Sequence, residues 1–98
     1  MLKITNDVEE FMSEDECVVY FTAEWCGPCK QLKPQYGKVS VIDQETNYYM
    51  VDVDKVKDSV LDSYNIKSIP QIFLMKKGNI AETIMSRKAE DILEELGK

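Results

Sequence analysis

The stretch that decides the fold is "VVYFTAEWCGPCKQLKP", which runs from Val18 to Pro34. It opens as a continuous apolar run, a pattern typical of a β-strand that is covered on both faces. Two cysteines, Cys26 and Cys29, then begin a pattern in which apolar residues recur every three or four positions, as on one face of a helix. The stretch therefore predicts a buried strand that leads into a helix, with both thiols at the junction.

Strand and helix patterns alternate along the rest of the chain. We expect strands at 2–5, 17–23 and 47–53, and two more within 71–85 around a turn at 77–79. The four predicted helices bury Val8, Phe11 and Met12; Cys29, Leu32, Tyr36, Val39 and Ile42; Val56, Val60, Leu61 and Tyr64; and Ala89, Ile92, Leu93 and Leu96. The first of these helices is expected to be capped by Asn6 or Asp7 and to end near Glu14. This order predicts an α/β domain with a mixed central β-sheet flanked by helices on both faces.

Length and charge limit what the chain can be. Its 98 residues fit a single domain, 1–98, that is large enough to bury one core. The formal charge of -6 argues against a nucleic-acid-binding surface. The acidic start of the chain lacks the apolar core of a signal peptide, and no apolar run is long enough to cross a bilayer. We therefore expect a soluble, intracellular protein, located in the cytoplasm. We also expect it to be a monomer.

The position of the cysteine pair favours redox chemistry. At the first turn of a helix, free backbone N–H groups and the helix dipole stabilise a thiolate, which should make Cys26 the more acidic thiol. Lys30, on the same helix face, adds a favourable charge, and Pro28 lies where its missing N–H costs least. Cys29 should be more buried, yet close enough to form a disulfide with Cys26. This asymmetry suits two-step thiol–disulfide exchange, in which Cys26 attacks and Cys29 resolves.

Two other uses of a close cysteine pair are a metal site and a structural disulfide. A structural zinc site has four ligands, whereas this chain has no histidine and one further cysteine, Cys17, which fits better as a small buried residue. A metal shared across a dimer and an inert structural disulfide remain as alternatives. The shared metal is disfavoured because the chain offers so few ligands, and the structural disulfide because disulfides in reducing compartments are usually catalytic. We expect no metal site.

With the pair placed, the chain resembles the thioredoxin family over essentially its whole length. "AEWCGPCK" at 23–30 matches the family's active-site signature, and Pro34 falls where the family has a helix proline. "SIP" at 68–70 matches the segment with the family's cis-proline, and "KKG" at 76–78 the hairpin that follows. The resemblance implies a thioredoxin fold and a reductase of disulfide-containing proteins. It also implies recharging by a thioredoxin reductase linked to NADPH or ferredoxin, and no cofactor beyond the Cys26–Cys29 disulfide.

The same resemblance implies roles for individual residues. Cys26 would be the nucleophile and Cys29 the resolving thiol. An apolar surface that receives the partner's disulfide would be formed by Trp25, Gly27, Pro28, Ile69 and Pro70. Pro70 would follow a cis peptide bond and leave the preceding backbone free to pair with a substrate peptide.

Three positions depart from the family pattern. Tyr20 stands where most members have a buried aspartate that accepts the proton of the resolving cysteine. With an ordinary pKa of about 10, a tyrosine is a poor base, so Tyr20 is interpreted mainly as a core aromatic, with a place in a proton network as the alternative. The hypothesis is that Cys29 loses its proton to water. Gln71 replaces a threonine, and Ser86 replaces a glycine. There Ser86 could narrow the substrate groove, cap a helix starting at Arg87, or do both.

The Gly-Pro between the cysteines is similar to that of the reducing members of the family, so we expect a reductase. A disulfide isomerase or oxidant of higher potential is the alternative enzyme, because the aspartate is missing. A non-redox subunit or scaffold is the alternative from another class.

A basic edge of the active-site helix is formed by Lys30, Lys33 and Lys38. We interpret it as a solvated face, with attraction of acidic partners as the weaker interpretation.

Overall fold

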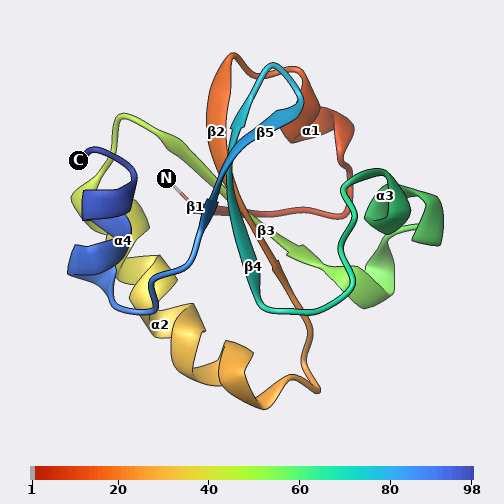
Figure 1. Cartoon of the computed structure of the whole chain (residues 1–98), viewed down its shortest axis with the longest axis horizontal. Helices are drawn as coiled ribbons and strands as arrows, with labels where there is room; N and C mark the ends of the chain where they lie inside the picture. Colours follow the sequence, from red (N-terminus) through yellow and green to blue (C-terminus); the bar gives the residue numbers. More distant parts are fainter. Residues whose placement is uncertain (1) are drawn as a thin grey trace.

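The computed structural model describes residues 2–98 and has the predicted order of elements (Figure 1). The strands are β1 (Leu2–Ile4), β2 (Glu16–Thr22), β3 (Asn47–Asp52), β4 (Gln71–Lys76) and β5 (Asn79–Ile84). The helices are α1 (Glu9–Met12), α2 (Gly27–Ile42), α3 (Asp58–Ser63) and α4 (Ala89–Glu95), with a short 3₁₀ turn at Val53–Lys55. No helix within 2–98 is both long and apolar enough to cross a membrane.

The strands form one five-stranded sheet in the order β1-β3-β2-β4-β5. β1 and β2 both pair parallel with β3, whereas β2 with β4 and β4 with β5 pair antiparallel. The prediction of a mixed sheet is therefore confirmed. Figure 1 shows α2 and α4 on one side of the sheet and α1 and α3 on the other, which confirms that helices cover both faces.

The central strand β2 is buried on both faces because its residues alternate between two cores. Val18 and Tyr20 belong to the cluster under α2 and α4. Cys17, Val19 and Phe21 belong to the cluster under α1 and α3. Burial on both faces explains why the sequence of β2 is an unbroken apolar run. It also holds the C-terminal end of the strand in place, and the cysteine pair follows that end.

Tyr36 fastens α2 to the sheet. Its buried hydroxyl lies 3.2 Å from the carbonyl oxygen of Val18 and 2.8 Å from that of Tyr49, so one side chain of the helix reaches two neighbouring strands. Since a buried hydroxyl without a hydrogen-bond partner is costly, these contacts favour a single position of α2 on the sheet. The position of α2 in turn fixes its N-terminal end, where both cysteines lie.

Two predicted core positions are wrong. Met12 is 43% exposed, because α1 ends at that residue instead of near Glu14. Ile42 is 65% exposed at the last residue of α2. The inward position next to it is taken by Asp43, which is 9% exposed and accepts a hydrogen bond from the Tyr48 hydroxyl at 2.7 Å. A satisfied polar group thus replaces the expected apolar one.

The expected cap at Ser86 is also wrong. α4 begins at Ala89, not at Arg87, and its N-cap is Lys88, which makes no side-chain cap hydrogen bond. Ser86 instead donates its hydroxyl to the carboxylate of Glu95, at the other end of α4. The reason is that the carboxylate of Glu95, the last residue of α4, accepts the Ser86 hydroxyl in a charge-assisted hydrogen bond, whereas a capping serine would use its oxygen to accept a backbone N–H.

Candidate active site

The loop that follows β2 delivers the first cysteine to the start of α2. Cys26 is the N-cap residue of α2, with an extended backbone (φ -85°, ψ 111°), and Pro28 follows within the first turn. The N–H of Cys29 donates to the sulfur of Cys26 at 3.3 Å. The Cys26 sulfur therefore occupies the place of an N-cap acceptor, where the helix dipole favours negative charge.

Cys26 and Cys29 form a disulfide, with their Cα atoms 5.3 Å apart. Cys29 is fully buried, whereas Cys26 is 4% exposed. The order of burial agrees with the sequence-based expectation. Only the Cys26 side of the pair reaches the surface, so an incoming sulfur atom meets Cys26 before it can meet Cys29.

The structure brings the predicted contact residues to the same end of the sheet. Trp25 is 67% exposed, and Gly27 and Pro28 are also exposed. The Ile69–Pro70 peptide bond is cis, and both residues are half-buried. The β2–β4 ladder ends at the Phe21–Gln71 pair, which places the cis bond beside the end of β2, next to the loop that carries Trp25.

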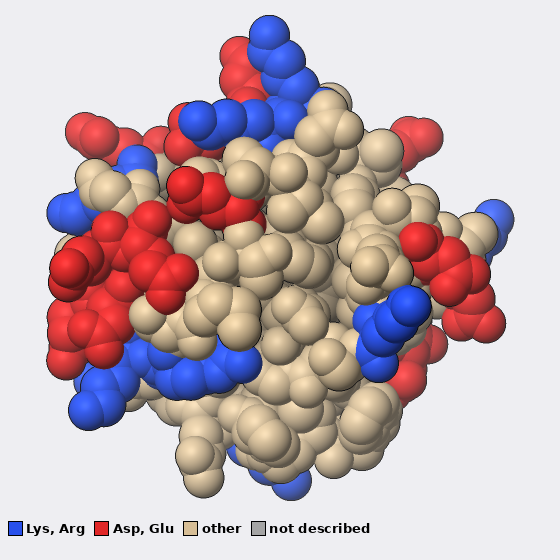
Figure 2. All heavy atoms as spheres, in the orientation of Figure 1, with Lys and Arg blue, Asp and Glu red and all other residues tan. Residues whose placement is uncertain are grey.

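A pocket of about 180 Å³ lies between two of these residues. Trp25 and Ile69 line it together with Lys67, Ser68 and the apolar residues Val53, Leu61 and Ile66. In Figure 2 the lower part of the visible face, over the loop into α2 and the start of β4 in Figure 1, is largely uncharged. The lining of this pocket suits an apolar side chain.

Tyr20 lies directly beneath the first turn of α2. It is fully buried, and its hydroxyl donates to the carbonyl oxygen of Cys29 at 3.2 Å. Its ring packs against that of Tyr36 with centroids 4.9 Å apart. Burial raises the pKa of Tyr20, and the nearby Thr22 hydroxyl and Arg87 charge offset only part of that rise. The phenol therefore stays protonated and acts as a donor, which makes it unsuited to accept the Cys29 proton.

Two further residues shape the surface and were missed by sequence reasoning. Asp54 accepts a hydrogen bond from the Trp25 indole N–H at 2.7 Å and so orients the exposed ring. Glu95 accepts hydrogen bonds from the N–H groups of Met85 (3.1 Å) and Ser86 (2.8 Å), which fixes the loop before α4. These contacts span 29, 10 and 9 residues of sequence, and no local pattern marks them.

Neither a candidate metal-binding cluster, within the described residues, nor the third cysteine lies at this site. Within 2–98 no group of three or more His, Cys, Asp or Glu side chains is placed to hold a metal ion. Cys17 is fully buried in the opposite core, with its sulfur 3.6 Å from the carbonyl oxygen of Phe11. Burial, followed by the charges of Glu14 and Glu16, raises the pKa of the Cys17 thiol to about 12.

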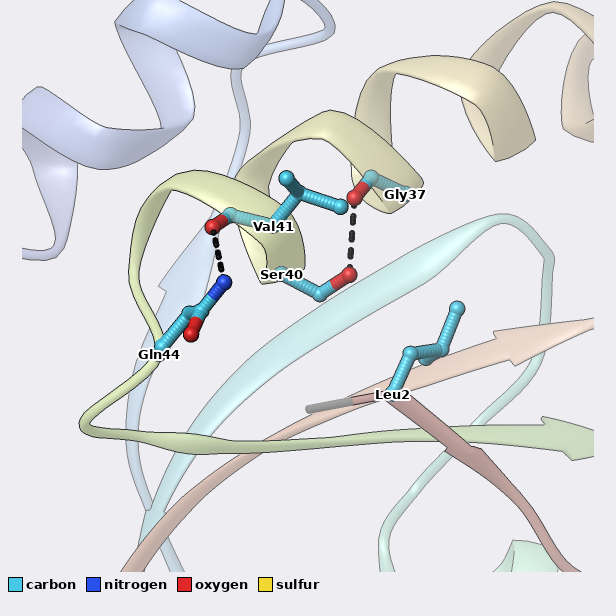
Figure 3. A pocket seen from close by; sticks show the side chains of 5 residues that line it. All are labelled: Leu2, Gly37, Ser40, Val41 and Gln44. Carbon is cyan, nitrogen blue, oxygen red and sulfur yellow. Dashed lines mark hydrogen bonds between the residues drawn. The ribbon is translucent and has the colours of Figure 1, made fainter.

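A wider pocket elsewhere carries no such chemistry. It measures about 710 Å³ and lies between β1 and the C-terminal half of α2, lined by Leu2, Gly37, Ser40, Val41 and Gln44. Figure 3 shows that Ser40 and Gln44 donate to backbone carbonyls of α2, those of Gly37 and Val41. Because its polar side chains are engaged by the helix itself and no titratable group lines it, this pocket is not the candidate active site.

Comparison with known proteins agrees with the geometry. The family model described as Thioredoxin matches residues 3–98. Thioredoxin 1 of Plasmodium falciparum is 37% identical over 89 residues, covering 87% of this chain and 85% of that protein. The solution structure of oxidised thioredoxin from P. falciparum superposes with a TM-score of 0.79 at 32% identity, covering 98% of this chain and 94% of the other.

Thioredoxin H8 of Arabidopsis thaliana is 33% identical over 81 residues, and the match spans 83% of this chain but only 54% of that longer protein. Sequence, fold and the position of the Cys26–Cys29 disulfide thus lead to the same assignment. The chain belongs to the thioredoxin family and is a dithiol–disulfide oxidoreductase.

Proposed function

We propose that this chain reduces disulfides in partner proteins, with Cys26 as the attacking thiol and Cys29 as the resolving thiol. The observation that carries the proposal is the asymmetry of the pair. The Cys26 sulfur accepts the Cys29 N–H at the start of α2, and Cys26 keeps a small exposed area (4%), whereas Cys29 is fully buried. A sulfur held by a helix N-terminus has a stabilised thiolate, and the thiolate is the nucleophile.

The exchange proceeds in two steps, each of which forms one disulfide bond and breaks another. The Cys26 thiolate attacks one sulfur of the partner's disulfide, that bond breaks, and the partner's other sulfur leaves as a thiolate that takes up a proton. Cys29 then loses its proton and attacks the Cys26 sulfur, which releases the partner's second thiolate. The partner gains two electrons and two protons, and the Cys26–Cys29 disulfide forms.

The surface around the pair has a role in the same proposal. Trp25, Gly27, Pro28, Ile69 and Pro70 receive the partner, and the pocket between Trp25 and Ile69 takes an apolar side chain near the partner's disulfide. Ile69 lies outside the β2–β4 ladder, so its backbone can pair with an extended segment of the partner.

The remaining parts of the proposal rest on the family match over 3–98. Residues 1–98 act as a single, monomeric thioredoxin domain in the cytoplasm, where it contributes to electron transport and redox homeostasis. A thioredoxin reductase linked to NADPH or ferredoxin recharges the disulfide, and no further cofactor takes part.

The roles of the two thiols can be tested by trapping. The reduced protein is mixed with a disulfide-bonded protein, and intact mass and released thiols are measured. Wild type should release thiols, Cys29→Ser should accumulate one mixed disulfide at Cys26, and Cys26→Ser should do neither. An adduct on Cys26→Ser but not on Cys29→Ser would reverse the roles. If wild type releases no thiols, the reductase proposal fails and the scaffold interpretation stands.

A redox titration separates reductase from oxidant. The protein is equilibrated in graded dithiothreitol buffers, and the single tryptophan, Trp25, is followed by fluorescence because it adjoins Cys26. A potential near that typical of thioredoxins, about -270 mV, supports the proposal. A potential near about -180 mV or above, as in disulfide isomerases, contradicts it.

A further inference from the structure

A second groove begins at the active site, on the face covered by α2 and α4. It measures about 360 Å³ and is lined by Pro28, Gln31, Leu32 and Gln35 of α2 and by Arg87 and Lys88 of the segment that leads into α4. Pro28 lies between the two cysteines in sequence, so the groove starts beside the disulfide. This groove shares no lining residue with the pocket between Trp25 and Ile69.

The charge of this groove is opposite to that of the chain. Both charged residues that line it are cations, whereas the whole chain carries a formal charge of -6. Within 2–98 the salt bridges are Lys3 with Glu10 and Lys98 with Asp43, so Arg87 and Lys88 have no ion-pair partner in the described part of the chain. Figure 2 shows Lys and Arg atoms just below the acidic cluster at the left edge, over the α2 and α4 region of Figure 1.

The rest of the lining completes a surface that suits a carboxylate. The side-chain oxygen of Gln35 accepts the N–H of Ala89 at 2.9 Å, which joins α2 to α4 and leaves the amide NH₂ as a donor. Leu32, only 2% exposed, provides an apolar floor. A guanidinium, an ammonium and amide donors around an apolar floor match the side chains of Asp and Glu, whose stems are apolar and whose ends accept hydrogen bonds.

We propose that this groove binds an acidic segment next to the disulfide of a partner protein, and so selects among substrates; the proposal rests on the protein-disulfide reductase function proposed above. An acidic chain repels acidic partners in general. A positive groove at the active site then acts as the local exception that draws such a partner in and sets its orientation toward Cys26. The electrostatic attraction changes how fast and how tightly the partner binds. It should therefore weaken as salt is raised, and it leaves the thiol chemistry unchanged.

The test compares three peptides that carry the same disulfide, flanked by Glu, by Gln or by Lys. For each protein the ratio of kcat/KM for the Glu-flanked to the Gln-flanked peptide is measured. Wild type should prefer the Glu-flanked peptide, and the double variant Arg87→Gln, Lys88→Gln should lower that ratio about threefold to tenfold. The preference of wild type should also fall when salt is raised from about 0.05 M to about 0.5 M.

A matched control removes the same charge elsewhere. Lys57→Gln, Lys76→Gln changes two exposed lysines outside both the groove and the basic edge of α2, and the ratio should stay at the wild-type value. An equal fall in both double variants would overturn the proposal in favour of an effect of net charge. A ratio that stays at the wild-type value in the Arg87 and Lys88 variant would overturn it as well.

A second readout does not depend on redox activity. A Glu-flanked peptide with serines in place of its cysteines is added to ¹⁵N-labelled oxidised protein. The side-chain amides of Gln31 and Gln35 and the backbone N–H groups of Arg87 and Lys88 should shift, and the Lys-flanked peptide should shift none of them. Shifts without any disulfide reduction would overturn the proposed function but support the groove. Normal reduction of the Gln-flanked peptide without these shifts would overturn the groove alone.

Discussion

At the scale of single residues, Tyr20 is the departure from the family that has the clearest structural consequence. A buried carboxylate at this position would have to be paired or protonated, whereas the phenol is satisfied by one hydrogen bond to the Cys29 carbonyl. Since burial raises the Tyr20 pKa, the hydroxyl holds the first turn of α2 in place and cannot act as a base at neutral pH. The Cys29 proton must then leave by another route, which we take to be water.

Changing Tyr20 tests this route. Tyr20→Asp supplies an internal base, so resolution of the mixed disulfide should become faster, and its rate should depend less steeply on pH between about pH 6 and about pH 9. The rate is measured by stopped-flow on a preformed mixed disulfide at Cys26. Tyr20→Phe is the control: it should keep the wild-type pH profile and lower the free energy of unfolding by about 1 kcal/mol through the lost hydrogen bond. An unchanged profile in Tyr20→Asp would show the water route to be wrong.

Cys17 should be chemically inert in the folded protein. With a pKa of about 12, its thiolate fraction near pH 8 is about a thousandfold below that of an ordinary thiol, and its burial also blocks access. In the Cys26→Ser, Cys29→Ser variant, alkylation by iodoacetamide should therefore be at least about a thousandfold slower in the native state than in denaturant. Intact mass gives both rates. Labelling of native Cys17 within a factor of ten of the denatured rate would contradict the buried placement.

At the scale of elements, Gly37 in α2 and Gly78 between β4 and β5 differ in what a side chain would meet. A Cβ added at Gly37 finds nothing within 4 Å, because that side of the helix opens toward the pocket in Figure 3. A Cβ at Gly78 would lie 3.2 Å from the backbone oxygen of Met12, and the residue has φ +81°. The first glycine weakens its element, and the second is required by the turn.

The two glycines therefore predict changes of opposite sign. Gly37→Ala should raise the free energy of unfolding by about 0.5–1 kcal/mol, since alanine loses less chain entropy in a helix. Gly78→Ala should lower it by about 1–2 kcal/mol, through the left-handed backbone and the contact with α1. Urea unfolding of the oxidised proteins measures both. Destabilisation by Gly37→Ala would mean that this part of α2 does not have the open face described.

How well the sequence predicts each element depends on where its apolar surface is covered. β2 reads as an unbroken apolar run because two cores cover it, and its bounds were predicted to within a residue. The end of α1 and the exposure of Ile42 at the end of α2 were not predicted, since periodicity shows which residues could be buried but not where the sheet beneath them stops. Met12 and Ile42 keep the helical spacing yet lie beyond that covered area.

At the scale of the whole molecule, the cysteine pair was predictable and its surroundings were not. The position of Cys26 at the start of α2 follows from local patterns, and the cis bond before Pro70 came from the family resemblance. The partners of Trp25 and Ser86, and the groove at Arg87, depend on segments that meet only after folding. A single sequence without its fold does not say which distant carboxylate will reach a given donor.

Asp43 makes a contact of this long-range kind, which joins the end of α2 to the C-terminus. Its carboxylate accepts from the Tyr48 hydroxyl at 2.7 Å and lies 3.7 Å from the Lys98 ammonium. Burial acts to raise the pKa of Asp43, but the hydrogen bonds from Tyr48 and Thr46 and the charge of Lys98 outweigh it and lower the pKa overall. A carboxyl whose folded pKa is depressed contributes stability above its unfolded pKa, about 3.9, and loses it as the pH falls through the folded value.

Asp43→Asn should consequently lower the free energy of unfolding by about 1–2 kcal/mol at neutral pH, because Tyr48 keeps an acceptor but loses a charged one. The difference from wild type should shrink as the pH is lowered below about 4, where the wild-type carboxyl becomes protonated as well. Urea unfolding at a series of pH values measures that difference. Asp62→Asn, at an exposed position of α3, is the matched control and should stay close to wild type throughout. If the loss of unfolding free energy in Asp43→Asn stayed constant into acid, the variant would be disturbing the packing. The charge of Asp43 would then not be what joins the end of α2 to the C-terminus.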